Sequence, residues 1–269
     1  MKPKSLFWGE HTWEELTEIA NTGAVVVVPF GAFEQHGPML PVDTDSNMAD
    51  KWAEDGARKA AEELGVPVLV LPTMPYGISG HHQRFAGTIW FEPEAYIGLV
   101  TQILTCVVGH GFRRIAILSG HGGNDPGIEL AIKNVVIAAE RPVRIGFFQD
   151  HRDPVFAKLS KAIWADEPSQ GQFSFHADRW ETSETLADRP HLVRRDRMVK
   201  AQLISTEKPE WGYMTHHITK TGASGDPSLA RADLGEKVWQ AWAEAMAQFI
   251  KRLADTPVPE SNDDWQPVQ

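Results

Sequence analysis

The sequence contains one cysteine, Cys106, and no uninterrupted apolar run of the roughly 18 residues that a membrane helix requires. A single cysteine excludes a disulfide framework within the chain, and the apolar helical pattern around Cys106 predicts a core thiol. The first residues, 1–5, are not followed by the apolar segment of a secretory signal. These absences predict a cytoplasmic protein with no membrane span.

Basic residues are also scarce, with 26 Lys and Arg against 36 Asp and Glu and a formal net charge of −10. Binding to nucleic acid needs a concentrated basic surface, so the partner is expected to be a small molecule. The 269 residues are 42% hydrophobic, which is ordinary for a globular protein. We expect one domain over residues 1–255 and a flexible tail over 256–269, which is rich in Pro, Asp and Glu.

Apolar strand patterns and amphipathic helical patterns alternate through the first 150 residues. Strands are predicted at 24–28, 66–71, 114–119 and 142–148. Helices are predicted at 12–20, 46–64, 94–109, from 125 onward, at 153–164 and at 234–253, whereas 168–183 is expected to be loop-like. Strands that are apolar at every position suit a sheet covered on both faces. The pattern therefore predicts an α/β fold with parallel neighbouring strands.

Ligand-type side chains follow the first of these strands. Glu34 and His36 lie two residues apart in a loop rich in Gly and Pro, and Asp43 and Asp45 come soon after. An isolated Glu or His in a loop is usually solvated, but this density of carboxylates and imidazoles suits zinc, manganese or a similar divalent ion. Spacing does not separate the two aspartates, because Asp43 could form a turn and Asp45 could cap the next helix.

His121 follows the third strand within the run 120–124, and the carboxyl ends of parallel strands meet at one edge of a sheet. It is either a ligand or a residue of a helix-entry turn, and the glycines around it favour a ligand. His176 and Glu181 form a further pair, either a buried structural network or an acid–base group with another metal ligand. Of His81 and His82, one could contact substrate while the other caps a loop.

Together these motifs resemble the creatininase family of metal hydrolases. The resemblance is carried by residues 31–38, 40–41, 45, 82–88, 120–124, 176, 181–183 and 225–227, in the order of the family. It implies a three-layer α/β/α fold with a mostly parallel central sheet, two divalent metal ions per subunit, zinc or manganese, and a homo-oligomer, often a hexamer. It also implies hydrolysis of an amide C–N bond in a small, often cyclic substrate.

Carried onto this sequence, the resemblance makes Asp45 rather than Asp43 the bridging ligand. It gives one metal to Glu34 and His121, the other to His36 and Glu181, and the role of proton carrier to His176. Gly123 stands where creatininase has a metal-binding glutamate, so Glu181 is expected to supply that ligand and to belong to the catalytic machinery.

Substrate contacts are expected from His82, Gly122, Gly123, Asn124, Phe175, Arg179 and Trp180. An arginine at position 179 departs from the family pattern and suggests an anionic or strongly polar substrate. In the expected reaction, a water activated by two metals attacks an amide and His176 gives a proton to the leaving group. The alternatives are cleavage of a C–C bond in a cyclic ketone such as a dehydro-inosose, hydrolysis of a formamide, and non-catalytic binding of a small molecule without metal.

Overall fold

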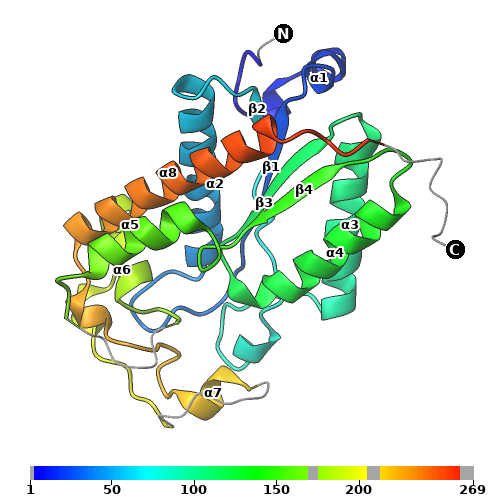
Figure 1. The fold of residues 1–269 in the computed structure, drawn as a ribbon. Helices are drawn as coiled ribbons and strands as arrows, with labels where there is room; N and C mark the ends of the chain where they lie inside the picture. Colours follow the sequence, from blue (N-terminus) through cyan, green and yellow to red (C-terminus); the bar gives the residue numbers. More distant parts are fainter. Residues whose placement is uncertain (1–2, 169–174, 205–212, 261–269) are drawn as a thin grey trace, which may run out of the picture.

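The computed structural model describes residues 3–168, 175–204 and 213–260 (Figure 1). Four parallel strands form its central sheet, in the order β2-β1-β3-β4. The strands are β1 (Val25–Phe30), β2 (Val68–Val70), β3 (Arg114–Ser119) and β4 (Arg144–Phe148). The predicted α/β fold with a parallel sheet is confirmed.

Helices cover both faces of this sheet and make the molecule three-layered (Figure 1). The helices are α1 (Trp13–Ala20), α2 (Thr44–Glu62), α3 (Pro93–Gly109), α4 (Asp125–Ala138), α5 (Pro154–Trp164), α6 (Arg179–Asp188), α7 (Thr215–Ile218) and α8 (Ala232–Asp255). The helices α2, α5, α6 and α8 share a core with one face of the sheet. On the opposite face, α1, α3 and α4 form the second core.

Strand β1 lies in the middle of this arrangement and is buried at all six positions. Val25 and Val27 belong to the core under α2 and α8, whereas Val26, Val28 and Phe30 belong to the core under α3 and α4. Alternate side chains of a strand point to opposite faces, so a strand covered on both faces is apolar throughout. This central position places the carboxyl end of β1 between two neighbouring strands.

Two expectations from the sequence are wrong. Part of the expected loop 168–183 is the start of helix α6. Residues 182–185 of this helix are all buried, although three of them are Thr or Ser. Because Ser183 Oγ and Thr185 Oγ1 donate to backbone oxygens one turn earlier, the helix buries polar residues without an apolar stripe. Cys106 is exposed rather than buried, since Leu104 and Val107 are the residues of this turn that face the core.

The chain leaves α8 at Thr256, and Pro257 O then accepts a hydrogen bond of 2.7 Å from Arg144 Nη2 on strand β4. Most of the tail expected over 256–269 lies outside the described residues, which end at 260. Within the described ranges, the helices are too short or too polar to cross a lipid bilayer.

Candidate metal centre

Glu34 and His36 lie on the loop that leaves the carboxyl end of β1, and Asp45 lies in the first turn of α2. The loop and the helix meet closely at Gly31, where a Cβ atom would lie 2.4 Å from Ser46 Cα. Only a residue without a side chain permits this approach. The result is that Glu34, His36 and Asp45 are at most 1% exposed.

His121 reaches the same place from the carboxyl end of the neighbouring strand, β3. Gly120 makes this possible, because a Cβ atom there would lie 2.2 Å from Asp45 O. The imidazole lies between two carboxylates, with Nδ1 3.3 Å from Asp45 Oδ2 and Nε2 3.3 Å from Glu34 Oε2. Segments 76 residues apart in the sequence therefore meet at one edge of the sheet, as parallel strands require.

Glu181 enters from the first turn of α6. Asp178 caps this helix by accepting a hydrogen bond of 3.3 Å from the Glu181 backbone N–H. Ala177, with φ of 48°, lies in the left-handed region and donates its N–H to Glu181 Oε2. His36 Nε2 then lies 2.9 Å from Asp45 Oδ1 and 3.8 Å from Glu181 Oε2.

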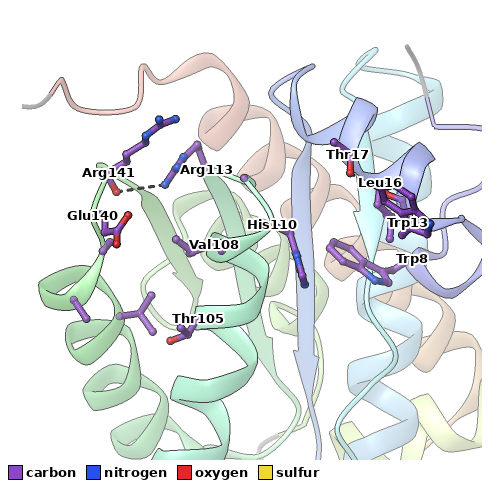
Figure 2. Close-up of a pocket in the computed structure, with 15 residues that line it drawn as sticks. Trp8, Trp13, Leu16, Thr17, Thr105, Val108, His110, Arg113, Glu140 and Arg141 are labelled. Atoms are coloured by element: carbon purple, nitrogen blue, oxygen red, sulfur yellow. Dashed lines mark hydrogen bonds between the residues drawn. The ribbon is translucent and has the colours of Figure 1, made fainter.

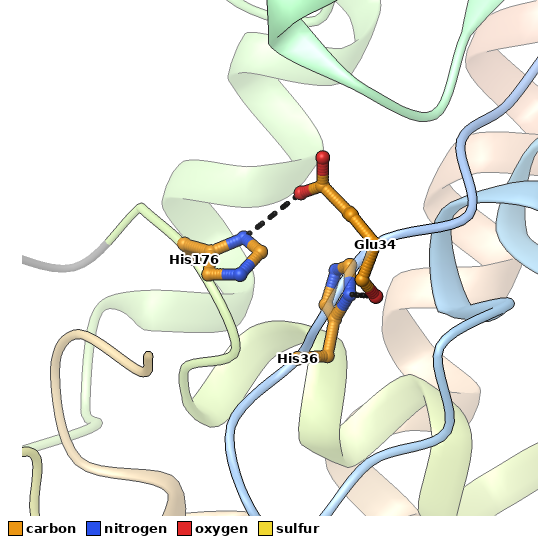
Figure 3. Close-up of side chains that lie close together, drawn as sticks. All are labelled: Glu34, His36 and His176. Atoms are coloured by element: carbon orange, nitrogen blue, oxygen red, sulfur yellow. Dashed lines mark hydrogen bonds and ion pairs between the residues drawn. The ribbon is translucent and has the colours of Figure 1, made fainter. Parts of the chain in front are cut away.

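These side chains form overlapping sets of three that could each hold a metal ion, with ligand atoms within 4.8 Å of one another. The first ligand group is Glu34, His81 and His121, the second ligand group is His36, Asp45 and Glu181, and a third set is Glu34, His36 and His176. In the third set the Glu34 carboxylate points toward the ring of His176 (Figure 3). His36 Nδ1 lies 3.1 Å from the backbone oxygen of Glu34, which accepts a hydrogen bond from it.

The buried polar atoms of this cluster fit a bound cation. Both carboxylate oxygens of Glu34, Nε2 of His36 and Oδ2 of Asp45 are buried and have no hydrogen-bond partner among the described residues. Burying such atoms without hydrogen bonds is costly, and buried carboxylates are normally hydrogen-bonded or coordinate a metal. A donor set of imidazole nitrogens and carboxylate oxygens suits zinc or manganese.

Burial and mutual charge shift the protonation of the cluster. Burial raises the pKa of Glu34 to about 7. Burial also opposes charge on His36, but Asp45 outweighs this effect and raises the pKa of His36 to about 10. Burial acts against ionisation of Asp45 as well, yet His36 and His121 hold the pKa of Asp45 below its usual range. Without a cation, the carboxylates thus pair with protonated imidazoles, and protons occupy the positions for which a metal ion would compete.

Gln35, between Glu34 and His36, organises the imidazoles around Glu34. Its Nε2 lies 2.6 Å from His82 Nδ1, 3.0 Å from Gly222 O and 2.9 Å from His176 Nε2. A side-chain amide has two N–H donors, which the first two partners use. The sequence placed Gln35 inside a motif but gave no signal of this role, because its partners come from distant loops.

The same count of donors sets the tautomer of His176. Its Nε2 lies 2.8 Å from Gln35 O, a carbonyl that can only accept, so Nε2 carries the proton. The lone pair is then on Nδ1, which faces Glu34 Oε1 at 3.5 Å. Burial holds the pKa of His176 well below its usual value, which keeps this ring neutral.

A cavity of about 400 Å³ opens onto the cluster, and a second hollow of about 300 Å³ adjoins it. Phe175, Glu181, Gly120 and Gly122 line both hollows. The ionisable side chains that line the second hollow are carboxylic acids, namely Asp125, Asp150, Asp178 and Glu181. Aromatic side chains from α6, α8 and β4 line the rest of the second hollow. The second hollow is therefore acidic and partly apolar.

The structure brings most of the expected substrate contacts to these hollows. His82, Gly122, Gly123 and Phe175 line the cavity at the cluster, and Trp180 lines the second hollow.

Asn124 and Arg179 lie elsewhere. Asn124 is fully buried and braces the loops, accepting from Ile78 N at 2.9 Å and donating to Gly31 O at 3.0 Å. Arg179 turns away from the cavity, and its guanidinium lies 4.5 Å over the ring of Trp164. The predicted role of Arg179 in selecting an anionic substrate therefore has no support from its position.

A larger groove, of about 1070 Å³, lies at the opposite end of the sheet (Figure 2). Trp8, Trp13 and His110 are among its lining residues, and Arg113 Nη1 donates to Arg141 O at 3.5 Å on its rim. None of the three ligand sets contributes to it. The chemistry of the described residues is concentrated at the smaller cavity.

Comparison with known proteins agrees with this geometry. The family model Creatininase, described as creatinine amidohydrolase, matches residues 9–250. The mycofactocin precursor peptide peptidase of Mycobacterium tuberculosis (strain CDC 1551 / Oshkosh) is 30% identical over 250 residues, which are 90% of each chain. The creatinine amidohydrolase of Pseudomonas putida is 27% identical over 264 residues, which are 92% of this chain and 97% of that protein.

Solved structures share the fold. A crystal structure of creatinine amidohydrolase superposes with a TM-score of 0.77 at 25% identity and covers 95% of this chain and 100% of that chain. Creatininases described as a Zn-Zn type and a Mn form are each 24% identical, with TM-scores of 0.77 and 0.76, and each covers 94% of this chain and 100% of its own.

Proposed function

The chain belongs to the creatininase family and is a hydrolase, and we propose that it cleaves the amide C–N bond of a small substrate at a centre of two divalent metal ions. One observation carries the proposal. The carboxylate of Glu34, Nε2 of His36 and Oδ2 of Asp45 are buried side by side without hydrogen-bond partners, at the floor of a cavity. A pair of cations would satisfy all of these atoms at once.

The first ion would be held by Glu34 and His121, the second by His36 and Glu181, with Asp45 shared. The two carboxylate oxygens of Asp45 already face opposite ways, one toward His36 and the other toward His121. When bound, two cations supply Lewis acidity that lowers the pKa of a water and polarises the substrate carbonyl.

His176 is the proton carrier in this proposal. Its Nε2–H is fixed on Gln35 O, so its free Nδ1 accepts a proton from the attacking water and later donates it to the leaving nitrogen. The low pKa of His176 keeps Nδ1 unprotonated before the reaction begins.

The hollows indicate the size and charge of the substrate. A cavity of about 400 Å³ accommodates a small cyclic amide, and the second hollow extends it past Glu181. This extension, together with similarity to a peptide peptidase, favours a second candidate function, the hydrolysis of a short peptide. The acidic lining of the second hollow suits a neutral or cationic group better than an anionic one.

Metal content and hydrolysis, measured together, test the proposal. We expect protein purified without chelator to carry zinc or manganese and to hydrolyse members of a panel of lactams, formamides, cyclic diketones and short peptides. Glu34→Ala and His36→Ala should each lose metal and reduce kcat/KM by about 100-fold or more, because each removes a ligand.

His110→Ala is the matched control, since this exposed imidazole lies in the groove at the other end of the sheet. It should keep both metal and activity. Full activity of the Glu34 and His36 variants with no metal lost would exclude the proposed centre, and binding of panel compounds without turnover would indicate a binding protein.

A further inference from the structure

The proposed function leaves His81 without a role, although this side chain lies at the metal centre. We propose that His81 is an additional ligand of the first ion, so that the two ions are held unequally. The first ligand group, completed by Asp45, then offers four protein ligands, whereas the second ligand group offers three. This inference rests on the proposed two-metal centre.

Position is the first argument. His81 belongs to the short 3-10 helix Gly80–His82 in the segment after β2, and it lines the cavity. Its ligand atom lies within 4.8 Å of those of Glu34 and His121. The rings of His81 and His121 are nearly parallel, with centroids 5.6 Å apart and planes at 11°. The ring of His81 thus lies beside the His121 imidazole, which contacts the carboxylate of Glu34 at 3.3 Å.

The contrast between His81 and its neighbour is the second argument. His82 has fixed partners, with Nδ1 2.6 Å from Gln35 Nε2 and Nε2 3.5 Å from Thr215 Oγ1. The His81 ring makes no hydrogen bond to any residue in the described ranges, and it is only partly exposed. A half-buried imidazole with both nitrogens uncommitted, beside a buried carboxylate that contacts other imidazoles without a regular hydrogen bond, is free to bind a cation.

Asp45 would be the fourth ligand of the first ion in this proposal. Its Oδ2 lies 3.3 Å from His121 Nδ1, while its Oδ1 lies 2.9 Å from His36 Nε2 in the second group. Gly123 supplies no ligand to either set, and a Cβ atom there would lie 2.3 Å from His121 Nε2. The second group therefore has only His36, Glu181 and the shared aspartate.

Unequal ligand numbers predict unequal behaviour. Four protein ligands close the coordination of an ion such as zinc, which is typical of tightly held metals. Three protein ligands leave a position open for water or substrate, which is typical of catalytic metals. We infer that the first ion is retained permanently, and that the second exchanges more readily and occupies the reactive position.

Zinc titration of the metal-free protein against a chromophoric chelator tests this inference. The natural protein should bind two equivalents with affinities at least about 10-fold apart. His81→Ala should weaken the tighter equivalent by about 10-fold or more and leave the weaker one unchanged. Glu181→Gln should weaken only the weaker equivalent, and His110→Ala should change neither.

X-ray absorption of the natural protein loaded with one equivalent of zinc gives a second measurement, independent of whether His81→Ala folds. Two imidazoles should surround the zinc, because the first group contains two and the second contains one. One imidazole, equal affinities for both equivalents, or unchanged binding in His81→Ala would overturn the inference while leaving the two-metal hydrolase intact. Failure of the natural protein to bind zinc or manganese would instead refute the proposed function.

Discussion

Glu184 is a buried carboxyl group that the metal centre does not use. It is 0% exposed, three residues beyond Glu181 on α6, and its Oε1 accepts a hydrogen bond of 2.9 Å from Trp52 Nε1. Burial raises the pKa of Glu184 well above its usual value, so the folded protein holds this proton more tightly than the unfolded chain does. The contribution of this proton to the free energy of unfolding is fully present below pH 4.5, the usual pKa of the group. It is lost as the pH rises toward the pKa of the folded state.

Glu184→Gln should remove this loss, because the amide keeps an oxygen for Trp52 and cannot ionise. Relative to the natural protein, the free energy of unfolding should increase with pH by about 1.4 kcal/mol per unit over the range in which only the folded state keeps the proton. Urea denaturation between pH 4 and pH 8 measures it. Glu18→Gln, the same change at an exposed helix position, is the control, and parallel stability curves for both variants would contradict the prediction.

At the scale of single residues, proximity to a strand end decided what could be predicted. Glu34, His36 and His121 could be identified as candidates because each follows a buried strand, and parallel strands bring such positions together. The direction of a side chain could not be predicted. Arg179 occupies the first position of α6 beside the site, yet packs on Trp164, because helix geometry rather than sequence distance sets where it points.

Helix α6 depends on a glycine of helix α8 for its position. A Cβ atom on Gly235 would lie 1.9 Å from Ser183 O, so the two helices touch through backbone. Ser183 is two residues from Glu181, the proposed ligand that α6 brings to the second group. The close packing of these helices thus connects the core to the metal centre.

Gly235→Ala should destabilise the protein by about 1–3 kcal/mol, as overpacking of a core does, and should weaken the second metal equivalent. Gly98→Ala is the matched control within helix α3, since its Cβ atom would meet nothing within 4 Å. That substitution should instead stabilise by about 0.5–1 kcal/mol through helix propensity. Chemical denaturation and zinc titration measure both effects, and equal stability of the two variants would show that α6 and α8 tolerate separation.

The sequence predicted elements well where they bury one regular apolar pattern. Strand 114–119 was predicted with the bounds that the structure shows for β3. The start of α6 was missed because its buried positions, such as Ser183 and Glu184, are polar and accept hydrogen bonds from distant parts of the chain. A short helix stabilised by long-range hydrogen bonds leaves no apolar period in the sequence.

On the scale of the whole molecule, the proposed ligand residues come from separate segments that only the complete fold assembles. The loop after β1, the start of α2, the loop after β3 and the start of α6 each contribute. The sequence could suggest their convergence through the order of strands and the family resemblance, but it could not show the two hollows. A homo-oligomer and a single domain over 1–255 stay predictions.

Because the unfolded chain scatters these segments, metal binding should stabilise the folded state of the entire molecule. A ligand present at about 1,000 times its Kd contributes about 4 kcal/mol, which raises the Tm of a chain this long by about 10 °C. Calorimetry of the zinc-loaded protein with and without excess chelator should show this difference, and added zinc should restore it. His36→Ala should show a smaller difference in Tm, and His110→Ala should show the full difference. If the Tm of the natural protein does not change with chelator, the fold is assembled without the ions.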